Sequence, residues 1–196
     1  RKGGEIKPSF FFAGLRGLAR VCQHLARGIC GRNGIMTCRP LFQFGKRNES
    51  YIWEINMAEA YIVAAVRTAG GRRDGKLKDW HPADLASQVI NELLDRSGAD
   101  PELVEDVIMG CVGQAGEQAA NIGRNAVLSS RLPESVPATS VDRQCGSSQQ
   151  SIHFAAQAVM SGTTDCVVAA GVETMSRVPM GLPISLPLHE GHGFYV

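Results

Sequence analysis

Residues 165–172 read DCVVAAGV, and they follow a helical pattern over residues 147–160 (SSQQSIHFAAQAVM) that ends at Ser161 and Gly162. An almost continuous apolar run of this length is typical of a strand that is covered on both faces of a sheet. Glycine directly after a helical pattern is a common stop signal. The two segments therefore predict one helix and one buried strand of an α/β fold.

The same alternation extends back toward the N-terminus. Three more runs of strand length are separated by two helical patterns and a short helical turn at Asp100 and Pro101; the strand runs are residues 61–68, 107–112 and 139–143, and the helices are residues 82–96 and 119–130. The order βαβαβαβ predicts an α/β fold with a mostly parallel sheet, helices on both faces and right-handed crossovers. From residue 176 the periodicity fades among prolines, and we expect a loop region cut off in mid-course.

Charge divides the chain at Met57, itself a plausible translation start. Residues 1–56 carry ten basic and three acidic residues, a net charge of +7, whereas residues 57–196 have a net charge of −6. We expect residues 1–56 to be an unstructured or upstream extension or a targeting segment, and residues 57–196 to form the folded domain. We expect a cytoplasmic protein. The alternative is a mitochondrial one, if a basic helix over residues 10–20, in a stretch without acidic residues, is part of a transit segment.

The overall composition limits the classes of function. The chain has 196 residues, 44% hydrophobic and 20% charged, with a formal net charge of +1. This is an ordinary globular composition, and it argues against a nucleic-acid-binding protein. The apolar runs are shorter than the roughly 18 residues that a membrane span needs, so we expect no membrane span. The six cysteines lack CxxC spacing and a secretory context, which favours free thiols.

One junction between a strand and a helix carries a nucleophile. In VDRQCGSS, residues 141–148, a strand ends near Arg143 and a helix begins near Ser147, which places Cys145 at the turn. The positive end of a helix dipole favours a thiolate there, and Gly146 allows a substrate to approach the backbone. The sequence alone leaves two interpretations open: a catalytic cysteine, or a buried turn cysteine with Ser147 or Ser148 as the helix cap.

These motifs resemble the thiolases, whose nucleophile region typically reads NRQCSSG, followed by a helix and a strand that ends in GGxExMS. The matching residues here are DRQCGSSQ at 142–149 and DCVVAAGVETMSRVPM at 165–180. The opening residues 61–79 and residues 113–141 (GQAGEQAANIGRNAVLSSRLPESVPATSV) are similar to the same family. The resemblance covers residues 57–187, and three separate motifs occur in the right order.

The resemblance implies an acyltransferase with a thiolase-like fold, of which this chain carries the N-terminal half. Cys145 would attack a 3-oxoacyl-CoA, release acetyl-CoA and carry an acyl thioester that free CoA removes; condensation of acetyl-CoA is the reverse. The Cys145 backbone N–H would contribute to an oxyanion hole. Coenzyme A is thus a co-substrate, and no permanent cofactor or metal is implied. Residues 114–124 match a stretch at the thiolase dimer contact, which implies a homodimer or homotetramer.

The resemblance also implies that important groups lie outside these 196 residues. Thiolases draw the histidine that activates the nucleophile, and a second cysteine, from a C-terminal domain. His153 lies eight residues beyond Cys145, about 12 Å along a helix, which is too far for it to be the base. We expect His81 to be a cap or surface residue and His189 and His192 (HEGH) not to bind metal. We therefore expect little or no turnover from the fragment.

Other interpretations stay open at this point. A 3-oxoacyl synthase also places a cysteine at a helix start, although ETMSRVPM (residues 173–180) favours a thiolase. A non-catalytic acyl-CoA-binding or lipid-transfer relative would have an unreactive Cys145, and a redox protein would need a resolving cysteine nearby. Gly113, Gly116 and Gly123 do not match the dinucleotide-binding pattern. Four basic residues form a solvated loop or contact a CoA phosphate: Arg72, Arg73, Lys76 and Lys78.

Overall fold

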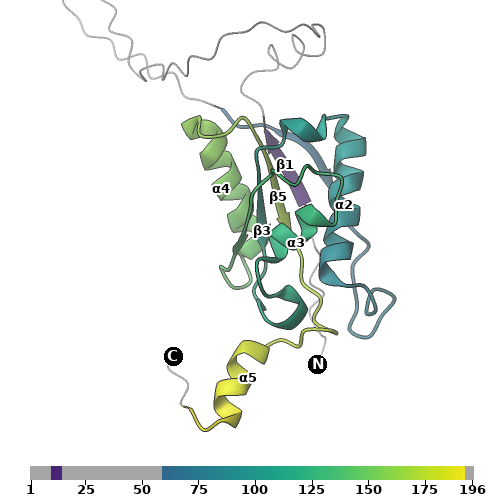
Figure 1. Cartoon of the computed structure of the whole chain (residues 1–196), viewed down its shortest axis with the longest axis vertical. Coiled ribbons are helices and arrows are strands. Elements are labelled where there is room, and N and C mark those ends of the chain that lie inside the picture. Colours follow the sequence, from purple (N-terminus) through teal and green to yellow (C-terminus); the bar gives the residue numbers. More distant parts are fainter. Residues whose placement is uncertain (1–9, 15–58, 193–196) are drawn as a thin grey trace, which may run out of the picture.

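The computed structural model describes residues 10–14 and 59–192, which form an α/β domain (Figure 1). Five strands and four helices make up its regular structure. The strands are β1 (Phe10–Gly14), β2 (Ile62–Val66), β3 (Asp106–Gly110), β4 (Ala138–Val141) and β5 (Cys166–Gly171). The helices are α2 (Pro82–Ser97), α3 (Ile122–Leu128), α4 (Ser147–Ser161) and α5 (Leu182–His189), with two short 3-10 turns, η1 (Pro101–Leu103) and η2 (Gly116–Gln118).

The strands form one mixed sheet in the order β2-β1-β5-β3-β4. β3 pairs in parallel with both β4 and β5, as the alternating order predicts. β1 pairs antiparallel with β2 on one side and with β5 on the other. β2, β3, β4 and β5 therefore all run in the same direction, and β1 alone runs against them.

Helices cover both faces of the sheet, which confirms the predicted fold class (Figure 1). α2 and α3 pack on one face with Val168 and Ala170 of β5, and α4 packs on the other face with Val167 and Ala169. Successive residues of a strand point to opposite faces, so both sets of β5 side chains are buried. This two-sided burial explains why β5 is an unbroken apolar run.

α2 has the ends that its sequence predicts. His81 is the N-cap, and its Nδ1 accepts a hydrogen bond from the backbone N–H of Ala83. Pro82 occupies the first turn, where its missing N–H costs nothing. Gly98 ends the helix in the left-handed conformation at φ 65°, which glycine adopts without a steric penalty. The prediction that His81 is a cap is confirmed.

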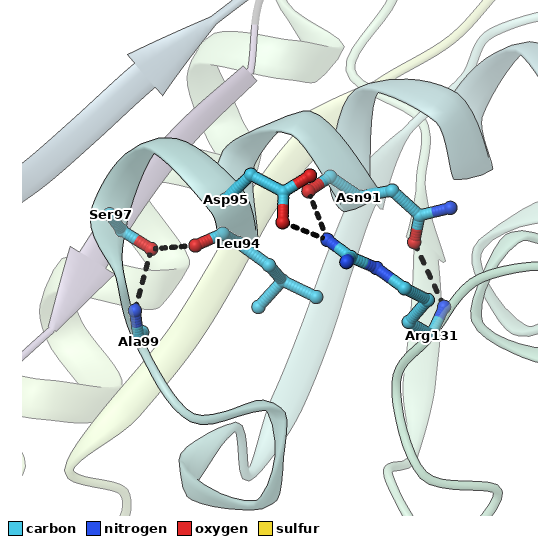
Figure 2. Close-up of polar contacts among 6 residues, drawn as sticks. All are labelled: Asn91, Leu94, Asp95, Ser97, Ala99 and Arg131. Carbon is cyan, nitrogen blue, oxygen red and sulfur yellow. Dashed lines mark hydrogen bonds and ion pairs between the residues drawn. The ribbon is translucent and has the colours of Figure 1, made fainter.

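A polar cluster fastens the loop after α3 to the last turns of α2 (Figure 2). The Arg131 backbone N–H donates to Oδ1 of Asn91, and its guanidinium donates to the Asn91 carbonyl and to Asp95 at 2.6 Å. In the same figure, Ser97 Oγ donates to the Leu94 carbonyl and accepts from the Ala99 N–H. Since the Arg131 and Asp95 side chains are half exposed, this pair orients the loop more than it stabilises the fold.

Two predictions for the N-terminal part differ from the structure. Residues 10–14 form a strand, not the start of a basic helix, because they pair with two neighbouring strands. The rest of that helix lies outside the described residues, and the boundary at residue 57 stays a prediction. β2 is not a buried strand, because it is an edge strand of the described sheet; Ile62 is 57% exposed.

Two predictions for helices also need correction. α3 is shorter than the predicted residues 119–130, because Ala120 and Asn121 have positive φ angles and break the helix at its N-terminal end. Asn121 then caps α3 with its side-chain oxygen on the Arg124 N–H. Residues 182–189, expected to be a loop, form α5 despite an internal proline at Pro187. An almost entirely apolar segment has no amphipathic period that would reveal such a helix.

We expect the Leu93→Ala substitution to lower the free energy of unfolding by about 2–5 kcal/mol, because the Leu93 side chain of α2 is fully buried in the core that α2 forms with the sheet. Leu103→Ala is the matched control, since the Leu103 side chain in η1 is 46% exposed and its removal leaves no cavity. That control should stay within about 0.5 kcal/mol. Urea denaturation followed by circular dichroism measures both, and equal losses would contradict the packing described here.

Candidate functional site

Cys145 lies exposed in a tight turn between the end of β4 at Val141 and the start of α4 at Ser147. The turn is closed by two backbone hydrogen bonds, from Gly146 N–H to the Arg143 carbonyl at 3.0 Å and from Ser147 N–H to the Gln144 carbonyl at 3.1 Å. Gln144, directly before the cysteine, has a positive φ of 46°. A non-glycine residue in this region is a strained feature that only surrounding contacts maintain.

Side chains on both sides of Cys145 supply those contacts. Asp142 Oδ1 accepts a hydrogen bond from the Gln144 N–H at 2.7 Å. Ser147 Oγ accepts from the Arg143 N–H at 2.9 Å and donates to the Gln144 carbonyl at 2.7 Å. The Arg143 guanidinium donates to Oε1 of Gln150 on α4. The backbone at Cys145 is therefore held in place from both β4 and α4.

Asp142 stands where thiolases usually have asparagine, and the structure gives its role. Its Oδ1 accepts from a backbone N–H two residues ahead, which is the hydrogen bond of an Asx turn. An asparagine side chain offers the same acceptor oxygen in the same position. The substitution therefore preserves the turn before Cys145 and adds a negative charge beside it.

The first turn of α4 packs directly on the ends of two strands because glycines leave room for it. A Cβ atom at Gly110, the last residue of β3, would lie 2.5 Å from the backbone of Ser147 and Ser148. A Cβ at Gly171, the last residue of β5, would lie 1.8 Å from Ser148 Oγ. Ser151 adds a hydrogen bond from its Oγ to the Ala170 carbonyl. These contacts fix the helix start that follows Cys145.

The segments that follow β3 and β5 are joined by a network centred on Gln118, which is fully buried. Its Nε2 donates to the Gly113 carbonyl at 2.7 Å, and its Oε1 accepts from the Thr174 N–H at 2.7 Å. Glu173 completes the connection, because its carboxylate accepts from the Gly113 N–H at 2.8 Å. A buried side-chain amide with its donor and acceptor both in use fixes the relative position of the two segments.

A bidentate ion pair closes the same region at the surface. The Arg177 guanidinium donates to both carboxylate oxygens of Glu117, at 2.5 and 2.6 Å, and also to the Asp79 carbonyl. The hydrogen bonds from Arg177 lower the pKa of Glu117. Asp79 belongs to the loop after β2, so segments that follow β2, β3 and β5 meet at one end of the sheet. Ligand sites of α/β folds lie at the carboxyl ends of their parallel strands.

Two buried cysteines contrast with Cys145. Burial raises the pKa of Cys111, just after β3, to about 12, and the negative charges of Glu173 and Asp142 act in the same direction. Burial, with the charges of Glu105 and Asp165, likewise raises the pKa of Cys166 to about 12. Because a thiolate is the reactive form of cysteine, both buried thiols are poor nucleophiles. All three described cysteines are free thiols; Cys22, Cys30 and Cys38 lie outside the described residues.

The described histidines do not complete the site. His81 accepts a hydrogen bond as the α2 cap, and His153 is an exposed residue two turns along α4. His192 lies 3.7 Å from the Glu190 carboxylate, and residues 10–14 and 59–192 contain no group of three potential metal ligands. Within the same ranges, no helix combines the length and apolar character of a membrane span.

The sequence predicts the turn that holds Cys145, but not the contacts at this end of the sheet. It does not predict that α4 packs on Gly110 and Gly171, or that Gln118 and Glu173 join the segments after β3 and β5. A signal existed in the small residues at the ends of β3 and β5, because glycine at a strand end often marks close backbone approach. The basic residues Arg72, Arg73, Lys76 and Lys78 are all exposed, as a solvated loop requires.

Comparisons with known proteins agree with this architecture. A family model described as "Thiolase, N-terminal domain" matches residues 60–192. A steroid 3-ketoacyl-CoA thiolase of Mycobacterium tuberculosis is 55% identical over 124 residues, which are 63% of this chain and 30% of that protein. A 3-oxoadipyl-CoA/3-oxo-5,6-dehydrosuberyl-CoA thiolase of Escherichia coli is 44% identical over 124 residues, which are 63% of this chain and 31% of that protein.

A solved structure of a related enzyme is also similar to this chain. The crystal structure of the Bacillus anthracis acetyl-CoA acetyltransferase is 39% identical and superposes with a TM-score of 0.58, over 61% of this chain and 30% of that chain. These matches confirm the resemblance that the motifs indicate. The chain spans less than a third of the length of these relatives.

We expect Gly110→Ala to destabilise the fold by about 1–3 kcal/mol or more, because the added methyl group meets the backbone of Ser147 and Ser148 and must displace the start of α4. Gly71→Ala is the matched control, because a Cβ there meets only Leu77 Cδ1 at 3.8 Å. Thermal unfolding measures both variants. A Gly110→Ala variant as stable as the control would show that α4 does not pack as described.

We also expect iodoacetamide at pH 8 to modify Cys145 well before Cys111 and Cys166. At a pH about four units below a pKa of about 12, only about one buried thiol in ten thousand is ionised, and both sulfurs are shielded from the reagent. Raising the pH toward 12, or unfolding the chain, should increase labelling of the buried pair. Tandem mass spectrometry locates the label, and equal labelling of all three in the folded chain would contradict their burial.

Proposed function

We propose, because this chain belongs to the thiolase family, that it carries the acyl-accepting cysteine of a thiolase reaction and that Cys145 is that residue. The substrates proposed are a 3-oxoacyl-CoA and free CoA in the degradative direction, or two molecules of acetyl-CoA in the condensing direction. The observation that carries the proposal is the exposure of the Cys145 sulfur in a turn whose backbone is fixed from both sides.

The proposed reaction has two covalent steps. The Cys145 thiolate attacks the C3 carbonyl carbon of the 3-oxoacyl-CoA, and the bond between C2 and C3 then breaks. The electron pair passes to C2, which takes a proton and leaves as acetyl-CoA, while the remaining acyl group stays on sulfur as a thioester. The CoA thiolate then attacks the carbonyl carbon of this thioester, the bond from that carbon to the Cys145 sulfur breaks, and the acyl group leaves as a shortened acyl-CoA while the Cys145 thiolate is restored. Covalent catalysis thus divides one difficult cleavage into two easier transfers.

Geometry supports this role for Cys145 and not for the other described cysteines. Cys145 follows β4, at the end of the sheet where the segments after β2, β3 and β5 also meet, whereas Cys111 and Cys166 are buried. The turn presents the Cys145 backbone N–H beside its own sulfur, where we propose that it hydrogen-bonds the developing oxyanion. Removing one such donor from other enzymes costs about 3–4 kcal/mol of transition-state stabilisation.

The proposal includes a limit on what these residues do alone. His81 is engaged as a helix cap, and His153 lies about 12 Å along α4 from the cysteine, so neither serves as the base of the thiol. We propose that the activating histidine and the second catalytic cysteine belong to the part of the thiolase that these residues do not include. The chain by itself then has little or no turnover.

Assembly into a homodimer or homotetramer remains part of the proposal.

Acyl transfer to a longer thiolase that contains this segment tests the nucleophile directly. We expect its incubation with acetyl-CoA or acetoacetyl-CoA at pH 8, followed by an acid quench, to leave an acyl adduct on Cys145 and none on Cys166, which lies in the same tryptic peptide. Cys145→Ser should abolish the labile thioester adduct. Cys166→Ser is the matched control and should leave the adduct unchanged. Tandem mass spectrometry of the quenched peptide locates the acyl group.

Two outcomes would contradict the proposal. In that longer thiolase, a Cys145 that reacts with iodoacetamide but takes no acyl group from either thioester would favour the non-catalytic acyl-CoA-binding alternative. Cleavage of acetoacetyl-CoA by a longer thiolase that contains this segment, retained after Cys145→Ser, would assign the nucleophile elsewhere. The first outcome concerns acyl transfer, and the second concerns turnover.

A further inference from the structure

The carbonyl group directly before Cys145 is held twice by one residue. The Ser147 backbone N–H, at 3.1 Å, and the Ser147 hydroxyl, at 2.7 Å, both donate to the Gln144 oxygen. The same hydroxyl accepts from the Arg143 N–H at 2.9 Å, so it acts as donor and acceptor at once. Ser147 is only 5% exposed, and hydrogen bonds in such a buried place are stronger than those in water.

This double contact also determines the direction of the next N–H group. The Gln144 carbonyl and the Cys145 N–H belong to one trans peptide group. Because the C=O and N–H of a trans peptide point in opposite directions, a carbonyl directed toward the first turn of α4 directs the Cys145 N–H away from it. The Cys145 N–H therefore points outward from the N-terminal end of α4.

The Cys145 N–H is available to a ligand. No residue within the described ranges accepts a hydrogen bond from it, whereas the next two backbone N–H groups, of Gly146 and Ser147, are both used inside the turn. A backbone N–H is a strong donor that needs a partner, which at an exposed position is water or a ligand. This N–H also points from the end of α4 where the helix dipole favours negative charge.

The other contacts of the turn fix different peptide groups. Asp142 accepts from the Gln144 N–H, which belongs to the peptide group before Gln144 and not to the one that carries the Cys145 N–H. Gln144 itself has a φ of 46°, in the left-handed region that a non-glycine residue keeps only when surrounding contacts maintain it. The Ser147 hydroxyl is thus the described side chain that holds the peptide group between Gln144 and Cys145.

We infer that Ser147 is a positioning residue for acyl transfer, because its hydroxyl aims the Cys145 N–H at the oxyanion. The inference rests on the proposed function and adds to it the residue that orients the donor. When the Cys145 sulfur attacks a carbonyl carbon, the electron pair of the C=O bond moves to its oxygen, and the oriented N–H donates to that oxygen. Ser147 acts only through the Gln144 carbonyl and does not touch the substrate.

Two reactions of the same sulfur separate this role from a general effect on the thiol. In acyl transfer from acetyl-CoA, the Cys145 thiolate adds to the thioester carbonyl, an oxyanion forms, and CoA then leaves as its thiolate. In alkylation by iodoacetamide, the thiolate displaces iodide from a saturated carbon, and no oxyanion forms. A residue that affects the ionisation or exposure of the thiol changes both rates, whereas a residue that aims the oxyanion donor changes only the first.

The longer thiolase that contains this segment is the protein to test. We expect Ser147→Ala to lower kcat for cleavage of acetoacetyl-CoA by about tenfold or more, with KM within about twofold, because the lost interaction belongs to the transition state. Loss of a complete oxyanion donor lowers kcat by about 10²–10³-fold in other enzymes, and a misdirected donor loses part of that. The rate of iodoacetamide modification at Cys145, followed by mass spectrometry, should stay within about twofold.

Ser87→Ala is the matched control. Ser87 of α2 is 2% exposed, and its hydroxyl donates to the carbonyl three residues earlier, of Asp84, as Ser147 does to Gln144. Ser87 lies outside the turn that holds Cys145, so its removal tests the loss of a buried helical serine by itself. We expect both variants to lose a similar amount of thermal stability, and only Ser147→Ala to lose kcat.

The outcomes separate this inference from the proposed function. Equal kcat values for Ser147→Ala and Ser87→Ala, or a Ser147→Ala variant whose alkylation slows as much as its acyl transfer, would overturn the inference and leave Cys145 as the nucleophile. An unsubstituted thiolase that is alkylated at Cys145 but takes no acyl group from acetyl-CoA would overturn both, because Ser147 would then have no oxyanion to serve.

Discussion

The close packing of α4 on the ends of β3 and β5 is the contact on which the site depends. Gly110 and Gly171 lack the Cβ atoms that would hold the helix away, so the backbone of Ser147 and Ser148 rests on the strand ends. The position of the turn that holds Cys145 follows from this contact. Protein interiors transmit small displacements with little loss because they are densely packed. A displacement of α4 at Gly110 or Gly171 would therefore also move the turn that holds Cys145.

The hydrogen bonds around the site divide into two groups with different roles. Asp142, Arg143 and Ser147 act locally and hold the turn in a conformation that includes a positive φ at Gln144. Gln118 and Glu173 act at longer range and join segments that lie about 55–60 positions apart in sequence. The local group holds the backbone of the turn at Cys145, and the long-range group fixes the segments after β3 and β5 relative to each other.

Local patterns predicted much of this fold. The caps of α2 at His81 and Gly98, the apolar run of β5 and the turn at Cys145 all depend on neighbouring residues, and the structure contains each of them. The exposed edge of β2 and the pairing of β1 depend on residues far away in sequence, and no local period reveals them. The assignment of Cys145 as nucleophile rests on family motifs and on its exposed turn, and its chemistry stays a prediction.

The central position of β1 has a consequence for the order of folding. Residue 11 pairs with residue 169, so β1 completes its pairing only after residue 169 has been synthesised. Closing so long a stretch of chain costs more entropy than forming a local hairpin. Contacts between such distant residues slow folding and lengthen the time during which apolar strands stay exposed. During synthesis, the edges of β2 and β5 that face β1 therefore stay unpaired until β1 is in place.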